Sequence, residues 1–395
     1  MKKVTLSLAL LSLALAALVA RGASTQNMTG KVERISERPG SAMFSIFNAC
    51  PESPDGKWVH YISYRALGKN NSDAVPAQVI LRERATGKER VLADIKVSNH
   101  NGANSIWLDE RTLAFQTYAN KFFSVVDVES GKKLVDSMAG ELPHKAGGGV
   151  VYFSRDAGNA KDKPGDWGVW ELNWKTGAVR QVVTQDRLFK ALHAIDSKIL
   201  GDKITLLHVD PSPDGKRVAV AYRYRVEDKQ KPEPLLVYFN AADGSGIGTL
   251  KNRPMHPLWY DNETFMGIFT QDSAKLISRY NLAGDRIEKM AGMTTHAGAS
   301  PDRKWFAGET SYYKPASDGY TRVCLYRRGE MKPAAILAEW KSGDAKSGSA
   351  DPTWTRNAHV SCSFSADGQR VYFTRVNREN RVEACVFEMG KLAGK

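Results

Sequence analysis

The chain has 395 residues, a formal net charge of +13 and four cysteines. The cysteines are widely spaced and form no C-x-x-C pair, which excludes zinc ribbons and redox-active dithiol motifs. The excess of positive charge favours an acidic partner.

The N-terminal segment, residues 1–23, has the pattern of a secretory signal. Lys2 and Lys3 precede a short apolar run rich in alanine and serine, which ends in small residues at Ala23. The alternative, a membrane anchor, needs ~20 apolar residues. We therefore expect an exported protein, secreted or periplasmic, with no membrane contact after signal removal and one domain over residues 24–395. In that location an anionic polysaccharide fits better as the partner than nucleic acid, and we expect a monomer.

Strand patterns fill the rest of the chain in order, separated by glycine-containing turns. They begin at Trp58, Val79, Thr112, Phe122, Val150, Leu235, Arg322 and Val371. The best helix candidate, Gln185 to Asp196, is short, and we interpret it as a loop decoration. The pattern predicts an all-β array.

One hairpin unit recurs along this array. It is clearest at His208 to Arg225, where H-V-D-P-S-P-D-G-K-R-V-A-V-A-Y-R-Y-R contains a Pro-Asp-Gly turn whose residues preset φ, bond the backbone and accept positive φ. With this unit included, the turns lie at Pro54, Leu108, Gly147, Pro213, Tyr260, Pro301 and Ala366. Seven units of four strands predict a seven-bladed β-propeller, with Gly30 to Ile35 adding a strand to the last blade. A β-sandwich is the alternative, but it does not require one turn at so many places.

In a propeller, the residues before each turn and those at the end of the strand after it converge at one mouth of the central channel. The first set contains His100, His208, His256, His296 and His359, which are five of the eight histidines. The second set contains Arg65, Tyr118, Arg223, Tyr312 and Arg375. Of the other histidines, His144 is a further candidate, His60 is interpreted as structural and His193 as a loop residue.

Any one of these histidines, taken alone, fits an ordinary core or rim position. Jointly, His256, His296 and His359 come from adjacent blades and could hold a divalent metal ion, because neutral imidazole is a common ligand. Cys362 lies three residues beyond His359, and an odd offset in a strand points to the opposite face. We therefore leave it out of the predicted site.

Several of these runs together resemble the β-propeller polysaccharide lyases, namely the oligogalacturonate and ulvan lyases. They are H-V-D-P-S-P-D-G-K-R with Arg223, M-H-P-L-W, T-H-A-G-A-S-P-D, A-H-V-S-C-S-F-S-A-D-G and N-H-N-G-A-N-S-I-W. The resemblance implies a propeller, a metal held by histidines near the channel, and β-elimination at a uronic acid by histidine, tyrosine and arginine. The catalytic tyrosine stays open among Tyr118, Tyr222, Tyr224 and Tyr312.

On this resemblance, His100 and His208 are the acid and base candidates, with His144 as a further one, and Arg223 clamps the uronate carboxylate. We expect the hairpin to bring His208 and Arg223 side by side. The remaining mouth residues would bind substrate: Arg65, Tyr118, Tyr224, Tyr312 and Arg375. The metal at His256, His296 and His359 is expected to be zinc, with manganese or calcium as alternatives.

The expected activity is cleavage of an ulvan-like uronic-acid polysaccharide. Two alternatives remain: an oligogalacturonate lyase acting on pectic fragments, and a non-catalytic periplasmic binding propeller. The propeller of a serine peptidase is disfavoured because the chain contains no G-x-S-x-G nucleophile elbow.

Overall fold

The computed structural model describes residues 31–45, 48–66, 74–98, 102–118, 121–143, 145–147, 149–155, 164–226, 233–250, 255–268, 276–293, 296–310, 320–341, 360–379 and 381–392. The predicted signal segment lies outside these ranges. Within them the chain forms twenty-seven strands, one α-helix, α2 (Gln185–Ile195), and two 3-10 helices, η1 (Pro164–Asp166) and η3 (Met389–Leu392). No helix of this described part is long and apolar enough to cross a membrane. The predicted all-β class is confirmed, apart from the helix.

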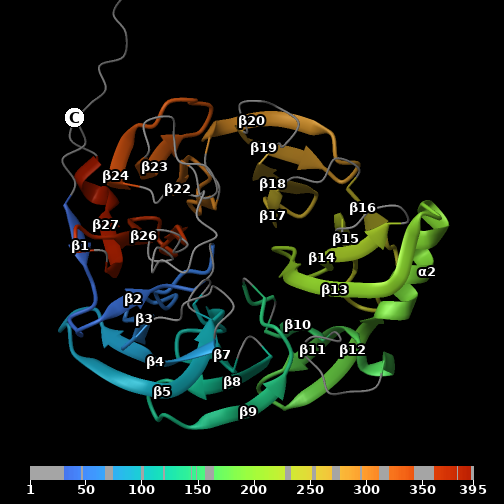
Figure 1. Ribbon diagram of the computed structural model, residues 1–395, viewed down its shortest axis with the longest axis horizontal. Helices are drawn as coiled ribbons and strands as arrows, with labels where there is room; N and C mark the ends of the chain where they lie inside the picture. The colour runs from blue at the N-terminus through green and yellow to red at the C-terminus, as the bar shows by residue number, and fades with distance from the viewer. Residues whose placement is uncertain are drawn as a thin grey trace, which may run out of the picture.

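The strands form antiparallel sheets that follow one another round a ring (Figure 1). An eight-stranded sheet contains β2 (Ser41–Met43), β3 (Trp58–Tyr64), β4 (Ala74–Glu83), β5 (Glu89–Ser98), β6 (Ser105–Trp107), β7 (Thr112–Tyr118), β8 (Phe122–Asp127) and β9 (Lys133–Ala139). A three-stranded sheet contains β10 (Val151–Arg155), β11 (Gly168–Asn173) and β12 (Ala178–Thr184).

The other four sheets have four strands each. The first contains β13 (Ile199–Pro211), β14 (Arg217–Val226), β15 (Glu233–Asn240) and β16 (Gly248–Thr249). The second contains β17 (Met255–Trp259), β18 (Thr264–Ile268), β19 (Leu276–Asn281) and β20 (Arg286–Met293). The third contains β21 (Gly298–Ala299), β22 (Trp305–Glu309), β23 (Tyr320–Arg327) and β24 (Ala335–Lys341). The fourth contains β25 (Ser363–Phe364), β26 (Arg370–Val376) and β27 (Val382–Glu388), together with β1 (Val32–Arg34).

The described residues thus form six sheets, where the sequence predicts seven blades of four strands. The two halves of the eight-stranded sheet are joined by one parallel pair, Lys96 of β5 with Tyr118 of β7. The three-stranded sheet has no innermost fourth strand among the described residues. An isolated bridge between Glu141 and Ser154 of β10 lies where that strand would be. This irregular sheet contains the hairpin near Gly147, whose turn signal is the weakest in the sequence.

Burial differs sharply between inner and outer strands. Strand β3 is buried at every position except Trp58, because neighbouring sheets pack against both of its faces. Strand β9, at the outer edge of its sheet, has no buried residue. Strand β3 can therefore carry large apolar side chains at successive positions, such as Tyr61 and Ile62, whereas β9 carries the charged Lys133 and Asp136.

Four of the predicted hairpin turns share one hydrogen-bond network. The serine that begins each turn donates its hydroxyl to the turn aspartate, at 2.5 Å for Ser53 and 2.8 Å for Ser212. The same hydroxyl accepts the amide five residues on, at 2.9 Å from Trp58 and 3.0 Å from Arg217. The turns that begin at Ser300 and Ser365 repeat both bonds. The predicted equivalence of these turns is confirmed at the level of individual bonds.

The first and last parts of the chain meet in one sheet. Strand β1 pairs antiparallel with β27, with Val32 opposite Phe387 and Arg34 opposite Cys385. In Figure 1 this places the blue N-terminal strand beside the red C-terminal one. The prediction that Gly30 to Ile35 would add a strand to the last blade is confirmed.

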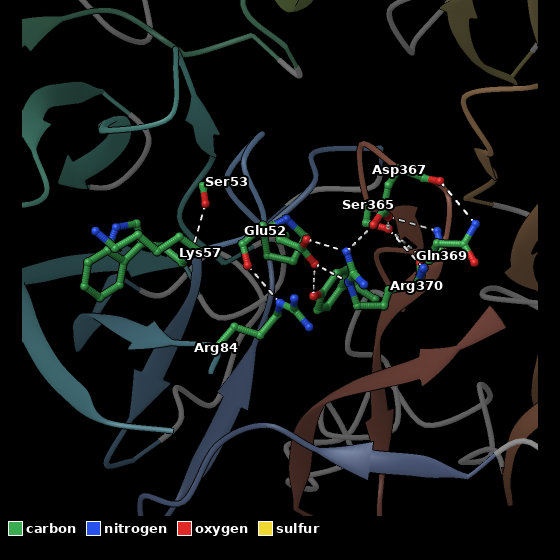
Figure 2. Close-up of polar contacts among 12 residues, drawn as sticks. Glu52, Ser53, Lys57, Arg84, Ser365, Asp367, Gln369 and Arg370 are labelled. Carbon is green, nitrogen blue, oxygen red and sulfur yellow. Dashed lines mark hydrogen bonds and ion pairs between the residues drawn. The ribbon is translucent and has the colours of Figure 1, made fainter. Parts of the chain in front are cut away.

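A buried ion pair strengthens this seam (Figure 2). Arg370 of β26 donates two parallel hydrogen bonds to the carboxylate of Glu52, from Nε at 2.7 Å and from Nη2 at 2.8 Å. Its Nη2 also bonds Asp367 at 2.7 Å, and the Tyr372 hydroxyl donates to Glu52. The side chains of Arg370 and Glu52 are 9% and 2% exposed. Burial and the Glu52 carboxylate raise the pKa of Tyr372 well above its usual value, so its hydroxyl stays a donor.

Helix α2 contributes to the core, which the loop-decoration interpretation did not anticipate. The Thr184 hydroxyl caps it by accepting the Arg187 amide at 3.1 Å. Leu188 and Leu192, four residues apart on one face, are fully buried in the cluster formed by the neighbouring sheets. All four cysteines, Cys50, Cys324, Cys362 and Cys385, are free thiols.

Gly215 tests the shared turn. Its φ is +69°, and a Cβ added there would meet nothing within 4 Å, so Gly215→Ala adds backbone strain without a steric clash. We expect it to lower the free energy of unfolding by ~1–2 kcal/mol in denaturant titrations. Gly165→Ala is the matched control, since that glycine has equal space and no left-handed φ. Equal stability of the two variants would contradict a conformational requirement at the turn.

Arg370 tests the seam. Arg370→Ala leaves the Glu52 carboxylate buried without its cation, and we expect a loss of roughly 3–5 kcal/mol in the free energy of unfolding. Arg328→Ala is the control, because Arg328 makes the same two-bond contact with Glu288, both at 2.7 Å, on the surface. It should cost at most about 1 kcal/mol. Similar losses in both variants would show that the seam pair is not special.

Candidate functional site

Three predicted histidines occupy one equivalent position, four residues before the first residue of a turn. They are His208 before Ser212, His256 before Tyr260 and His296 before Ser300. At His208 and His256 the inner strand is bulged, with φ of 54° and 51°. In β13 the two residues His208 and Val209 face one residue of β14, and the register of β17 shifts in the same way. Bulges of this kind re-aim side chains next to functional sites.

The structure brings two of the predicted metal ligands together. The imidazole rings of His256 and His296 have centroids 4.4 Å apart at an interplanar angle of 52°. His296 is fully buried, whereas His256 is half-buried. His256 lies in β17 and His296 directly precedes β21, so the pair spans the boundary between two sheets.

A glutamate that the sequence analysis missed completes this cluster. Glu309, the last residue of β22, is fully buried, and its Oε1 contacts Nδ1 of His296. Its Oε2 accepts the backbone amide of Val360 at 3.3 Å, in the segment that leads to β25 of the adjacent sheet. The available sequence signal was a single carboxylate at the end of the apolar strand W-F-A-G-E, opposite His296 when the hairpin register is continued.

The donor set fits a divalent ion in part. Two imidazoles that share an ion at ~2.1 Å per nitrogen must lie a few ångströms apart, as these rings do. A carboxylate bonded to the far nitrogen of a ligand histidine is the usual outer partner at such sites. In the described part of the chain, however, no group of three or more His, Cys, Asp or Glu side chains could hold a metal. His359, the third predicted ligand, lies outside the described residues.

Cys362, which the sequence analysis left out of the metal set, is fully buried near this cluster. Burial raises the pKa of its thiol well above the usual value, and the negative charge of Glu309 acts in the same direction. A neutral thiol is a poor metal ligand.

The expected juxtaposition of His208 and Arg223 is wrong in its register. Strand β13 begins at Ile199, not at His208, and Arg223 pairs with Thr205. Three positions along a strand separate the two residues by ~10 Å. Arg223 is exposed and His208 half-buried, so both could still contact one extended substrate, but not as adjacent groups.

Tyr222 and Tyr224 differ in their environment. Tyr222 is buried, and burial raises the pKa of its hydroxyl above the usual value. Tyr224 is half-buried, with its ring centroid 6.1 Å from that of Tyr222. Of these two tyrosines, Tyr224 is therefore the better placed for substrate.

The other predicted mouth residues vary in their freedom to bind substrate. Arg65 is exposed directly after β3, and Tyr118 is 48% exposed at the end of β7. Arg375 donates from Nε to Glu383 at 2.9 Å, so its charge is already compensated. Arg155, at the end of β10, was not predicted, and its guanidinium lies 4.5 Å from the Trp170 ring. The remaining predictions, His100, His144 and Tyr312, fall outside the described residues.

His60 and His193, which the sequence analysis did not place in the site, each contact a neighbouring protein group through a ring nitrogen. His60 is fully buried with Nε2 2.6 Å from the Ser105 hydroxyl, and burial lowers its pKa to about 4. His193 lies in the last turn of α2, where its Nδ1 is 3.0 Å from the carbonyl oxygen of Ile199.

No protein-family profile and no curated protein sequence matches the chain. Among solved structures, an oligogalacturonate lyase from Vibrio parahaemolyticus matches with 14% identity and a TM-score of 0.57, over 92% of this chain and 94% of the lyase. An oligogalacturonate lyase in complex with manganese matches over the same shares, with 13% identity and a TM-score of 0.55. A prolyl endopeptidase matches with 15% identity and a TM-score of 0.53, over 99% of this chain but 53% of the peptidase.

At such identities these similarities concern the fold. The chain is a nearly all-β protein whose structural neighbours are propeller-type enzymes, and oligogalacturonate lyases match it over nearly their full length.

Proposed function

We propose that this protein is a lyase that cleaves uronic-acid oligosaccharides of the oligogalacturonate type by β-elimination. The observation that carries the proposal is the cluster of His256, His296 and Glu309, at the place in the ring where the sequence repeat predicts a site. The two lyase neighbours support the same reaction class. They favour pectic fragments, the alternative of the sequence analysis, over ulvan, its first choice.

The proposed fold has seven blades. The eight-stranded sheet divides naturally at the single pair between Lys96 and Tyr118 into two blades of four strands. The pairing of β1 with β27 would then close the ring. We further propose export after removal of residues 1–23, one domain over residues 24–395, and a monomer.

The reaction needs a base for the C5 proton of the uronate, an acid for the departing O4 and positive charge beside the carboxylate. His208 is a half-buried imidazole at a bulge, suited to proton transfer. Arg223, exposed further along the adjacent strand, can hold the carboxylate with two parallel hydrogen bonds. Because about three residue positions separate them, they would act on different parts of the oligosaccharide, with Tyr224 beside Arg223. His100 and His144 remain acid or base candidates.

His256, His296 and His359 would hold a divalent ion. When bound, the ion would help neutralise the uronate carboxylate as charge develops at C5. The sequence analysis placed zinc first. Manganese is now preferred, because the lyase neighbour was solved in complex with manganese.

Product formation tests the activity. Purified protein with manganese should release unsaturated oligosaccharides, detected by ultraviolet absorbance, from oligogalacturonate and not from ulvan. Arg223→Lys keeps the charge but loses the planar fork, so we expect about a hundredfold lower rate. Arg180→Lys, on the outer strand β12 and paired with Glu171, should match the wild type. Product from ulvan alone would restore the first choice, and no product from either would favour a binding propeller.

Metal analysis tests the ligand set. His256→Ala and His296→Ala should each lose most of the bound manganese after dialysis, measured by atomic emission, because an incomplete donor set holds the ion weakly. His193→Ala, on helix α2 and away from the cluster, should retain it. Wild-type manganese content in both cluster variants would remove these histidines from the site.

A further inference from the structure

Glu309 makes two contacts that connect neighbouring sheets. Its Oε1 contacts Nδ1 of His296, and its Oε2 accepts the amide of Val360 at 3.3 Å. Both Glu309 and His296 are fully buried. Val360 directly follows His359 in the chain. One carboxylate therefore contacts His296, a predicted metal ligand, and the backbone of Val360 in the segment that leads to the next sheet.

The backbone register explains why this contact forms at His296. Gly298 pairs with Ala307, so the continued register sets His296 opposite Glu309. The equivalent histidines face other residues: His208 shares Val220 with its neighbour at the bulge, and His256 lies across from Gly267 in the same way. Of the three described histidines at this position, His296 is the one with a carboxylate opposite it.

A carboxylate beside one ring nitrogen determines the form of the imidazole. An ionised carboxylate only accepts hydrogen bonds, so Nδ1 must carry the proton, and in the neutral ring Nε2 then keeps its lone pair. The contact also fixes the rotation of the ring. This is the form in which a histidine binds a metal through Nε2.

We propose that Glu309 is a positioning residue that holds His296 in the Nδ1-protonated tautomer, with Nε2 as the metal-binding nitrogen beside His256. The inference rests on the proposed function, because it assigns a role to a residue next to the proposed metal ligands. The two imidazole rings, with centroids 4.4 Å apart, would then present two nitrogen donors to a metal ion in a fixed arrangement.

The test compares two variants that each remove the partner of a buried histidine. Glu309→Gln replaces the acceptor of His296 by a neutral amide, and Ser105→Ala removes the partner of His60, which lies 2.6 Å away. Binding of Mn²⁺ to the metal-free proteins is measured by isothermal titration calorimetry. We expect Glu309→Gln to weaken binding by about 10-fold to 100-fold and Ser105→Ala to leave it unchanged.

A second readout needs no metal. Two-bond proton–nitrogen NMR correlations of the metal-free wild type should show His296 with its proton on Nδ1, and Glu309→Gln should shift it toward a mixture of tautomers. Should Glu309→Gln fail to fold, Glu309→Asp replaces it in both measurements, with weakened binding expected because the shorter carboxylate cannot reach both partners.

The outcomes separate the two levels of the argument. Wild-type Mn²⁺ affinity in Glu309→Gln overturns the positioning role alone, and so does an Nε2-protonated His296. Absence of Mn²⁺ binding to the wild type overturns both the metal site and the positioning role. Weakened binding together with the Nδ1-protonated form supports the proposal.

Discussion

A buried ion pair between Glu52 and Arg370 links the first and last parts of the chain. Glu52 and Arg370 are 318 residues apart in sequence, yet their buried two-bond contact links the loop before β3 to β26. Together with the β1–β27 pairing, it fixes the first sheet beside the last. In the proposed closed ring each sheet would be held between two neighbours. We infer that this packing brings His256 and His296, at equivalent sequence positions of adjacent sheets, within contact distance of one another.

Local chemistry explains what could be predicted from the sequence. A serine, an aspartate and a residue able to adopt positive φ specify the turn through bonds within six residues, so Ser53, Ser212, Ser300 and Ser365 were readable without any tertiary context. The equivalence of His256 and His296 followed from their distance to those turns. Their actual proximity, with imidazole centroids 4.4 Å apart, depends on how the two adjacent sheets pack, which no local sequence pattern shows.

One error comes from the strand register and two have tertiary causes. The offset between His208 and Arg223 follows from the pairing next to the turn, where Asp210 faces Ala219, and from the bulge, which adds one more position before Thr205 meets Arg223. Helix α2 is stabilised because Leu188 and Leu192 are buried against neighbouring sheets. A local sequence pattern does not show that packing. Glu309 carried no motif. Its role becomes visible only once the strand register sets it opposite His296, inside an interior where a carboxylate must be partnered.

The left-handed backbone at His208 and His256 has a consequence for how such a protein can change. Holding a residue other than glycine or asparagine in this conformation costs on the order of 1–3 kcal/mol. In this chain φ is 54° at His208 and 51° at His256. Selection for thermal stability alone would therefore favour glycine or asparagine at both positions and erase the imidazoles. Stability and the proposed chemistry compete at the same two backbone angles, so variants evolved for heat resistance are expected to lose the candidate site before they lose the fold.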